Sequence, residues 1–181
     1  MKWMESADLA RLVFIDESGA NLSMGRSHAW IERGVERFDP RPMNWGSNLT
    51  MIGAIRCDGW VMLNTQYQTA NGDRFVSWIR KLARKLRPGD IVIMDNARPH
   101  HDARVAPILR AVGAKVHYLP PYSPDLNPIE PAWAIVKKGI RASAPRERNA
   151  LRKVVRRVRW RVTPLHCFRW AEHSGYRRRH N

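Results

Sequence analysis

Two short apolar runs, each followed by an aspartate, constrain the fold of this chain most strongly. Leu12–Ile15 leads into Asp16, and Ile91–Met94 leads into Asp95. Short, apolar and partly β-branched runs predict buried strands, and such strands in an α/β protein deliver functional residues at their C-terminal ends. If the two strands are neighbours in the sheet, the two carboxylates lie side by side.

A third carboxylate, Glu130, belongs to the segment Asn127-Pro128-Ile129-Glu130. This segment predicts the start of a helix, with Asn127 as the N-cap and Pro128 in the first turn. The apolar face of that helix continues through Ile129, Trp133, Val136 and Ile140. A Glu three residues after the cap also fits a capping box, which is a structural alternative for Glu130. A turn or surface position is the corresponding alternative for each aspartate.

The remaining pattern predicts a mixed sheet flanked by helices. Before any helix we expect antiparallel strands at 9–17, around 29–31, at 49–55 and at 60–63, with a loop over 32–46 and a hairpin at Asp58-Gly59. Later strands are expected at 91–94 and 116–119, and helices at 71–86, 102–112, from 127, at 146–162 and from 164. This order is typical of an α/β fold.

Charge favours a polyanionic partner. Thirty-two Lys and Arg against sixteen Asp and Glu give a net charge of +16 and a pI near 11.1, which favours nucleic acid. The excess is mainly C-terminal, because residues 137–181 contain fifteen basic residues and only two acidic ones, Glu147 and Glu172. We therefore expect a main domain over residues 1–142 and a basic helical extension over 143–181, packed on the same domain.

Membrane, export and zinc-dependent classes have no support in the sequence. No apolar run approaches the ~18 residues of a membrane span, and the N-terminal residues show no signal segment. Cys57 and Cys167 form no paired motif, so both are expected to be free thiols. The expected location is the cytoplasm.

The three carboxylates suggest a metal site. Gathered without charged partners they would repel one another, so cations between them are expected. Oxygen ligands with open positions suit Mg²⁺ or Mn²⁺ rather than zinc. Two such ions ~3.5–4 Å apart can promote a phosphodiester displacement. Since neighbouring side chains on a strand face opposite sides, we expect Asp16 in the site and Glu17 on its rim.

Three segments resemble the catalytic core of DDE transposases of the mariner superfamily and their bacterial insertion-sequence relatives. They are Phe14–Gly19, Met94–Ala97 with His100, and Tyr122–Glu130 with Trp133 and Lys137. The resemblance implies a ribonuclease-H-like fold and a triad of Asp16, Asp95 and Glu130 that binds two Mg²⁺ or Mn²⁺ ions. It also implies metal-dependent cleavage at a transposon end, followed by attack of the freed 3′-hydroxyl on target DNA.

Further residues are candidates for supporting roles. Asn96 and His100 match the second segment and would position DNA or the metal site, although an exposed loop histidine is an equally good explanation for His100. Trp133 is expected in the core, and Asp125 in a turn with Pro124. The candidates for DNA binding along the basic helices are Lys137, Lys138, Arg148, Arg152, Arg156 and Arg159.

One feature departs from the family. Its members carry helix-turn-helix modules upstream of the core, whereas only fifteen residues precede Asp16 here. We therefore expect a frameshift partner, a fragment or a relic, acting with an upstream helix-turn-helix product, and a homodimer on DNA. Two alternatives are another ribonuclease-H-like nuclease, such as a junction resolvase or an RNA–DNA hybrid hydrolase, and a catalytically silent DNA-binding remnant.

Overall fold

The computed structural model describes residues 8–26, 28, 30–36, 38, 48–67 and 71–176, and a five-stranded mixed sheet runs through them. Its strands are β1 (Leu12–Ala20), β2 (Leu49–Arg56), β3 (Gly59–Gln66), β4 (Ile91–Met94) and β5 (Lys115–Tyr118). The helices are α2 (Gly72–Ala83), α3 (Val105–Arg110), α4 (Glu130–Ser143), α5 (Arg148–Val158) and α6 (Pro164–His173). The expected mixed sheet with flanking helices is therefore confirmed.

The strand order is β3-β2-β1-β4-β5. β1 pairs antiparallel with β2, and β2 pairs antiparallel with β3. On its other side β1 pairs parallel with β4, with Phe14 opposite Ile93, and β4 pairs parallel with β5. The first three strands are thus antiparallel, as predicted, and the two strands that lead into Asp16 and Asp95 are direct neighbours.

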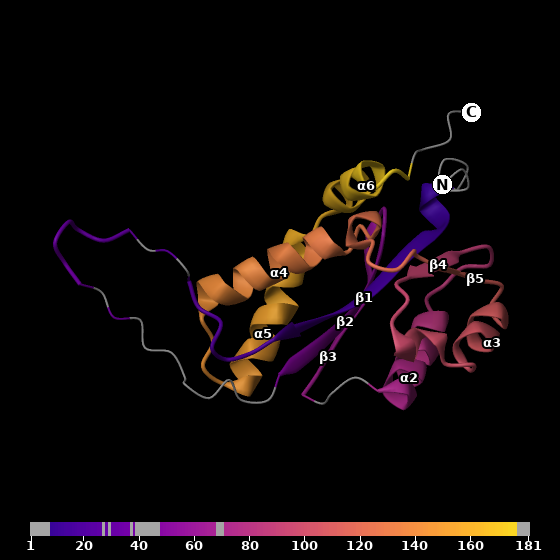
Figure 1. The fold of residues 1–181 in the computed structure, drawn as a ribbon, viewed down its shortest axis with the longest axis horizontal. Coiled ribbons are helices and arrows are strands. Elements are labelled where there is room, and N and C mark those ends of the chain that lie inside the picture. The colour runs from indigo at the N-terminus through magenta and orange to yellow at the C-terminus, as the bar shows by residue number, and fades with distance from the viewer. Residues whose placement is uncertain are drawn as a thin grey trace.

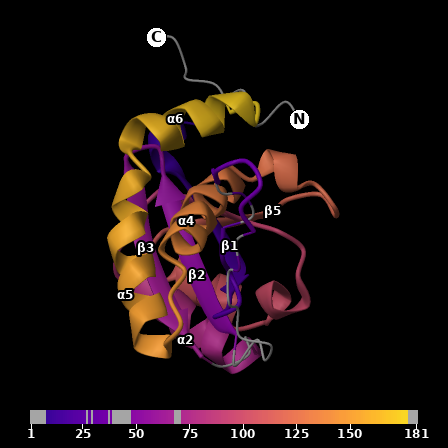
Figure 2. The ribbon, with the colours of Figure 1, turned by 90° about the vertical axis from the view of Figure 1, so that its left-hand side faces the viewer.

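Helices cover both faces of the sheet (Figure 1), with α4, α5 and α6 on one side and α2 and α3 on the other. The side chains of β1 alternate between these two layers. Leu12 and Phe14 join the core beneath α4, α5 and α6, whereas Val13 and Ile15 join the core beneath α2 and α3. Figure 2 shows α5 lying along the side of the sheet where β3 forms the edge.

Two predicted helix starts are confirmed by their caps. The side chain of Asn71 accepts a hydrogen bond from the backbone N–H of Arg74 at the start of α2. Thr163 caps α6 by accepting from the N–H of His166, with Pro164 as the first helical residue. Both caps satisfy N–H groups that have no partner inside the helix.

The N-terminal expectations were partly wrong. Residues Leu9–Arg11 form a 3₁₀ turn, because the Asp8 side chain accepts from the N–H of Ala10, and β1 extends to Ala20 through pairing with Leu49. Trp30 and Ile31 lie outside any strand, so the strand expected around 29–31 is wrong for these two residues, and Ala29 lies outside the described residues. The loop expected over 32–46 holds for 32–36 and 38, which lie in no helix or strand.

Three later elements differ in their bounds. The helix expected over 102–112 is only Val105–Arg110, preceded by a 3₁₀ turn at Arg98–His101, because Asp102 accepts from the N–H of Arg104 and holds the chain in a turn. The helix expected over 146–162 is α5 followed by a 3₁₀ turn at Arg159–Arg161. β5 begins one residue earlier than expected.

Residues 143–176 contribute to the same core as the sheet. Leu151, Val155 and Val158 of α5 are buried beside Trp133 of α4. The two helices approach closely because a Cβ at Gly139 would lie 2.6 Å from Val158 Cγ1. Whether residue 142 marks a domain boundary stays a prediction. Within the described ranges, no helix combines the length and hydropathy that membrane crossing requires.

A second glycine makes room for two tryptophans. A Cβ on Gly53 of β2 would lie 2.7 Å from the ring of Trp60 and 2.8 Å from the ring of Trp133. The two indole rings pack against each other, with centroids 5.6 Å apart. Since real Cβ atoms do not approach other carbons this closely, only glycine at position 53 permits this arrangement.

We predict that Gly53→Ala destabilises the fold by about 1–3 kcal/mol, because the added methyl group overpacks the tryptophan pair. Urea unfolding monitored by tryptophan fluorescence measures the effect. Gly19→Ala is the matched control, since Gly19 is also a strand glycine but a methyl group added there would meet no atom within 4 Å. Equal stability of the two variants would contradict the prediction.

Candidate active site

Asp16 and Asp95 lie next to each other in the sheet. In the parallel register of β1 and β4, Phe14 lies opposite Ile93, and the two aspartates follow these residues at the same spacing. Asp16 projects toward α4, where one of its oxygens, Oδ2, accepts a hydrogen bond of 2.9 Å from the Trp133 indole Nε1. The prediction that the two carboxylates are neighbours is therefore correct in position.

The three predicted carboxylates line one cavity of about 440 Å³. Asp16 comes from β1, Asp95 follows β4, and Glu130 is the exposed first residue of α4. The wall opposite the sheet is the segment between β5 and α4, with Leu119, Pro120, Pro121, Tyr122, Ser123, Pro124 and Asn127. Three elements that are distant in sequence thus bring one carboxylate each to the same space.

The carboxylates share the cavity but are not drawn together around one point. Among the described residues, no group of three His, Cys, Asp or Glu side chains is close enough to hold a metal ion as the side chains stand. No lysine or arginine in the described ranges forms an ion pair with Asp16, Asp95 or Glu130. Their negative charges are therefore not neutralised by a basic side chain.

The pKa of Asp16 is raised to about 7. Burial is the largest cause, and the negative charges of Glu130 and Asp95 raise the pKa further. The backbone N–H of Glu17 and the indole of Trp133 oppose this by donating hydrogen bonds to the ionised form. Asp16 is thus a half-protonated acid at neutral pH unless a cation lies beside it.

Asp95 behaves in the opposite way, because His100 holds its charge. Nδ1 of His100 lies 2.6 Å from Asp95 Oδ1 and 3.2 Å from the Asp95 carbonyl oxygen. Both oxygens are acceptors, so Nδ1 carries the proton. This hydrogen bond lowers the pKa of Asp95, and the Asp95 partner raises the pKa of His100 against the effect of its burial.

His100 is not an exposed loop residue. It is only 2 % exposed and packs on the ring of Phe75 in α2, with centroids 4.5 Å apart. Of the two explanations that the sequence left open, the exposed loop histidine is therefore wrong. The contact between Asp95 and His100 is a supporting interaction that the spacing of the two residues alone did not predict.

Glu17 is closer to the site than expected. It is half-buried rather than on a rim, and no described residue bonds to its buried oxygen Oε1. Burial raises its pKa, the charge of His100 lowers it, and the charge of Asp95 raises it. Glu17 therefore faces the opposite side of the sheet from Asp16, as predicted, but still lies within electrostatic reach of Asp95.

The start of α4 differs from the expectation. The helix begins at Glu130 without a side-chain cap, so Asn127 is not its N-cap. Asn127 is buried instead, and its Nδ2 donates a 3.3 Å hydrogen bond to the carbonyl oxygen of Ile15 in β1. The capping box considered for Glu130 is consequently absent, and its carboxylate is left facing the cavity.

The donor chemistry of the cavity fits a hard divalent cation. The available ligands are carboxylate oxygens, which suit Mg²⁺ or Mn²⁺. A divalent cation would also reverse the effect of Glu130 and Asp95 on Asp16, because a nearby positive charge favours ionised carboxylates. These residues therefore fit such a group in donor type and charge, once Glu130 moves toward the aspartates.

The other candidate residues fall into two groups. Asn96 lines the cavity, where its Nδ2 donates 2.6 Å to the Leu119 carbonyl and its Oδ1 lies 2.8 Å from His101 Nε2. The basic candidates lie outside the cavity, on α4 for Lys137 and Lys138, on α5 for Arg148, Arg152 and Arg156, and just after α5 for Arg159. Their role in DNA binding stays a prediction.

We predict that Trp133→Phe weakens metal binding by roughly tenfold at neutral pH. The ring stays in the core, but the loss of the indole N–H removes a donor to Asp16, so its pKa rises and a proton competes more strongly with the metal. Mn²⁺ binding measured by calorimetry tests this. Trp78→Phe is the control, because no described residue bonds to its buried Nε1, and unchanged binding in both variants would contradict the prediction.

Asp16 also predicts an unusual pH dependence of stability. Its pKa in the folded state is about 7 against an ordinary value of 3.8, so its contribution is complete below pH 4 and is lost as pH rises toward 7. In metal-free urea unfolding, Asp16→Asn should match the parent near pH 4 and exceed it near pH 8 by up to about 4 kcal/mol. Parallel pH profiles for parent and variant would rule this out.

Comparison with known proteins agrees with this architecture. The catalytic domain of Mos1 mariner transposase superposes with a TM-score of 0.67 at 16% identity, over 94% of this chain and 80% of that chain. A Mos1 transposase paired-end complex with the left transposon end gives a TM-score of 0.78 at 19% identity, over 94% of this chain and 54% of that chain. A Mos1 paired-end complex with Mg gives 0.75 at 20% identity over the same shares. The ribonuclease-H-like fold is therefore confirmed.

The chain thus spans about half the length of the transposase chains in those complexes. Comparison with curated protein sequences finds no match. A family match, by contrast, covers most of the chain, because residues 11–152 match the family described as DDE superfamily endonuclease. The match includes Asp16, Asp95 and Glu130, and the chain belongs to the DDE endonuclease superfamily.

Proposed function

We propose that this chain is the catalytic part of a DDE transposase, which cleaves and joins DNA by metal-dependent phosphodiester transesterification. The observation that carries the proposal is that Asp16, Asp95 and Glu130 line one cavity in a member of this superfamily. The structures that resemble it include complexes of Mos1 transposase with transposon-end DNA. The net charge of +16 suits a DNA substrate.

The proposed ligands for two Mg²⁺ or Mn²⁺ ions are Asp16, Asp95 and Glu130. When bound, such ions activate the attacking oxygen and stabilise the leaving oxygen. Trp133 would hold Asp16 in place through its hydrogen bond, and His100 would hold Asp95 with one oxygen while the other stays open to the cavity. In this arrangement each aspartate is oriented by a buried side chain that is not itself a ligand.

Two displacements at phosphorus make up the proposed reaction. In the first, the oxygen of a water molecule bonds to the scissile phosphorus, the bond from phosphorus to O3′ breaks, and the released 3′ oxygen takes up a proton. In the second, that 3′-hydroxyl loses its proton, bonds to a phosphorus of target DNA and displaces a 3′ oxygen there. Each step exchanges one phosphodiester oxygen for another, so no oxidant or reductant is needed.

The assembly and setting of the proposed enzyme also stay predictions. We propose that it acts on transposon-end and target DNA in the cytoplasm, at the nucleoid, as a homodimer. Because the chain spans about half of the related transposase chains, recognition of specific ends is assigned to a helix-turn-helix module outside the described residues. The same fold would also suit a different ribonuclease-H-like nuclease, and strand transfer separates the two.

Plasmid nicking tests the proposal. We expect the chain to nick supercoiled plasmid with Mn²⁺ and to join a 3′-hydroxyl oligonucleotide to plasmid DNA, and Asp95→Asn should reduce both reactions to the metal-free background. The matched control is Asp73→Asn, an exposed aspartate on α2 that pairs with Arg104. Equal activity of the parent and Asp95→Asn would remove Asp95 from the mechanism, and nicking without joining would favour a simple nuclease.

A further inference from the structure

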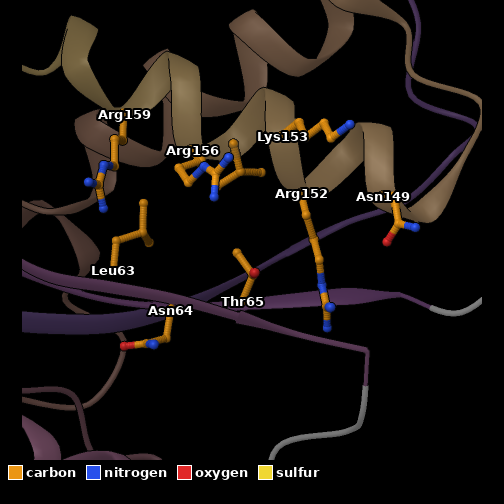
Figure 3. A pocket seen from close by; sticks show the side chains of 9 residues that line it. Leu63, Asn64, Thr65, Asn149, Arg152, Lys153, Arg156 and Arg159 are labelled. Atoms are coloured by element: carbon orange, nitrogen blue, oxygen red, sulfur yellow. The ribbon is translucent and has the colours of Figure 1, made fainter.

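A basic groove follows the free edge of the sheet. Two adjoining cavities of about 430 and 890 Å³ lie along β3, which is the edge strand, and they share Leu63, Asn64 and Arg159. We call the two together the edge groove. Figure 3 shows part of it, with Arg152, Arg156 and Arg159 extending from α5 and the turn after it toward β3.

Positive charge lines the edge groove from both layers of the fold. Seven of its residues are basic and one, Asp58, is acidic. The basic residues come from α5 and the turn that follows it on one face of the sheet and from α2 and its C-terminal end on the other, namely Arg152, Lys153, Arg156, Arg159, Lys81, Arg84 and Lys85. The edge of the sheet is thus bordered by cations on two sides.

Aromatic rings, not carboxylates, hold the arginines of the groove. The guanidinium of Arg152 lies 4.9 Å from the ring centroid of Tyr67, and that of Arg159 lies 4.5 Å from the ring centroid of Trp160. No carboxylate in the described ranges pairs with Arg152, Arg156 or Arg159. Stacking restricts these side chains but leaves their charge uncompensated, which favours a bound anion.

The spacing of the arginines suits a chain of phosphates. Arg152, Arg156 and Arg159 follow one another at i, i+4 and i+7, so they share one helix face. With a rise of about 1.5 Å per residue they span roughly 10 Å. One strand of B-DNA carries a phosphate about every 3.4 Å along its axis, so this row matches about three successive phosphates.

We propose that the edge groove binds the phosphodiester backbone of duplex DNA at a place separate from the catalytic cavity. The inference rests on the proposed function, because it assumes that DNA is the substrate. The two places share no lining residue, and β2 lies between β3 and β1. DNA in the groove is held by charge alone, without metal and without sequence preference, which keeps the duplex on the chain during the two displacements.

Binding to a 30-base-pair duplex in EDTA, measured by fluorescence anisotropy between 50 and 200 mM NaCl, tests the groove without catalysis. Arg152→Gln/Arg156→Gln should reduce the slope of log K against log[salt] by about 1.8, since each phosphate contact contributes about 0.9. The affinity lost over this salt range should then be about tenfold smaller than in the parent.

The matched control removes the same charge at the opposite edge of the sheet. Arg110→Gln/Lys115→Gln changes two exposed residues at the end of α3 and the start of β5 and should leave the slope unchanged. Arg152→Lys/Arg156→Lys retains the charge and should retain the slope, which separates a loss of phosphate contacts from a disturbed fold. Equal reduction of the slope by both Gln pairs, or none by the groove pair, overturns the inference.

Two further outcomes are distinct. If an acidic peptide protects the β3 amides from hydrogen exchange and the groove arginines do not affect DNA binding, the edge accepts an added strand instead and the inference fails. Because binding is measured without metal, its result does not depend on nicking. Absent nicking with the predicted change in slope would leave the groove intact and remove the proposed catalytic function.

Discussion

The hydrogen bond from the Trp133 indole to Asp16 joins the packing of this fold to the chemistry of its cavity. It requires α4 to lie directly over β1, and it requires space beneath the ring, which Gly53 provides because it has no side chain. Trp60 of β3 closes the other side of the ring. Three strands and one helix therefore determine the position of a single carboxylate.

The same arrangement sets the two aspartates at different protonation states. Burial raises the pKa of Asp16 to about 7, whereas the bond from His100 lowers that of Asp95. Adjacent carboxylates with opposite shifts are typical of functional sites, since a purely structural core would place neither there. A free energy cost in the metal-free fold is the consequence, because burial of an ionised Asp16 is unfavourable until a cation compensates its charge.

The sequence allowed the main features of the site to be predicted, because they depend on local patterns. Apolar runs that lead into Asp16 and Asp95 identified two buried strands, and segment resemblance supplied Glu130. Contacts between distant segments were beyond such patterns. The Asn127 amide satisfies a carbonyl of β1 instead of capping α4, and His100 packs beneath α2. Likewise, the arginine face of α5 was predicted from its period, but not that it borders the edge strand.

A chain of contacts connects the edge groove to the cavity. The Trp60 indole donates a 3.0 Å hydrogen bond to the carbonyl of Arg159, its ring packs on Trp133, and Trp133 bonds to Asp16. Residues in contact rarely act additively. A substitution in the tryptophan pair that displaces the end of α5 therefore also displaces a catalytic carboxylate, so DNA affinity and metal affinity should not vary independently there. Only a double-mutant cycle between the groove and Trp133 can separate the two contributions.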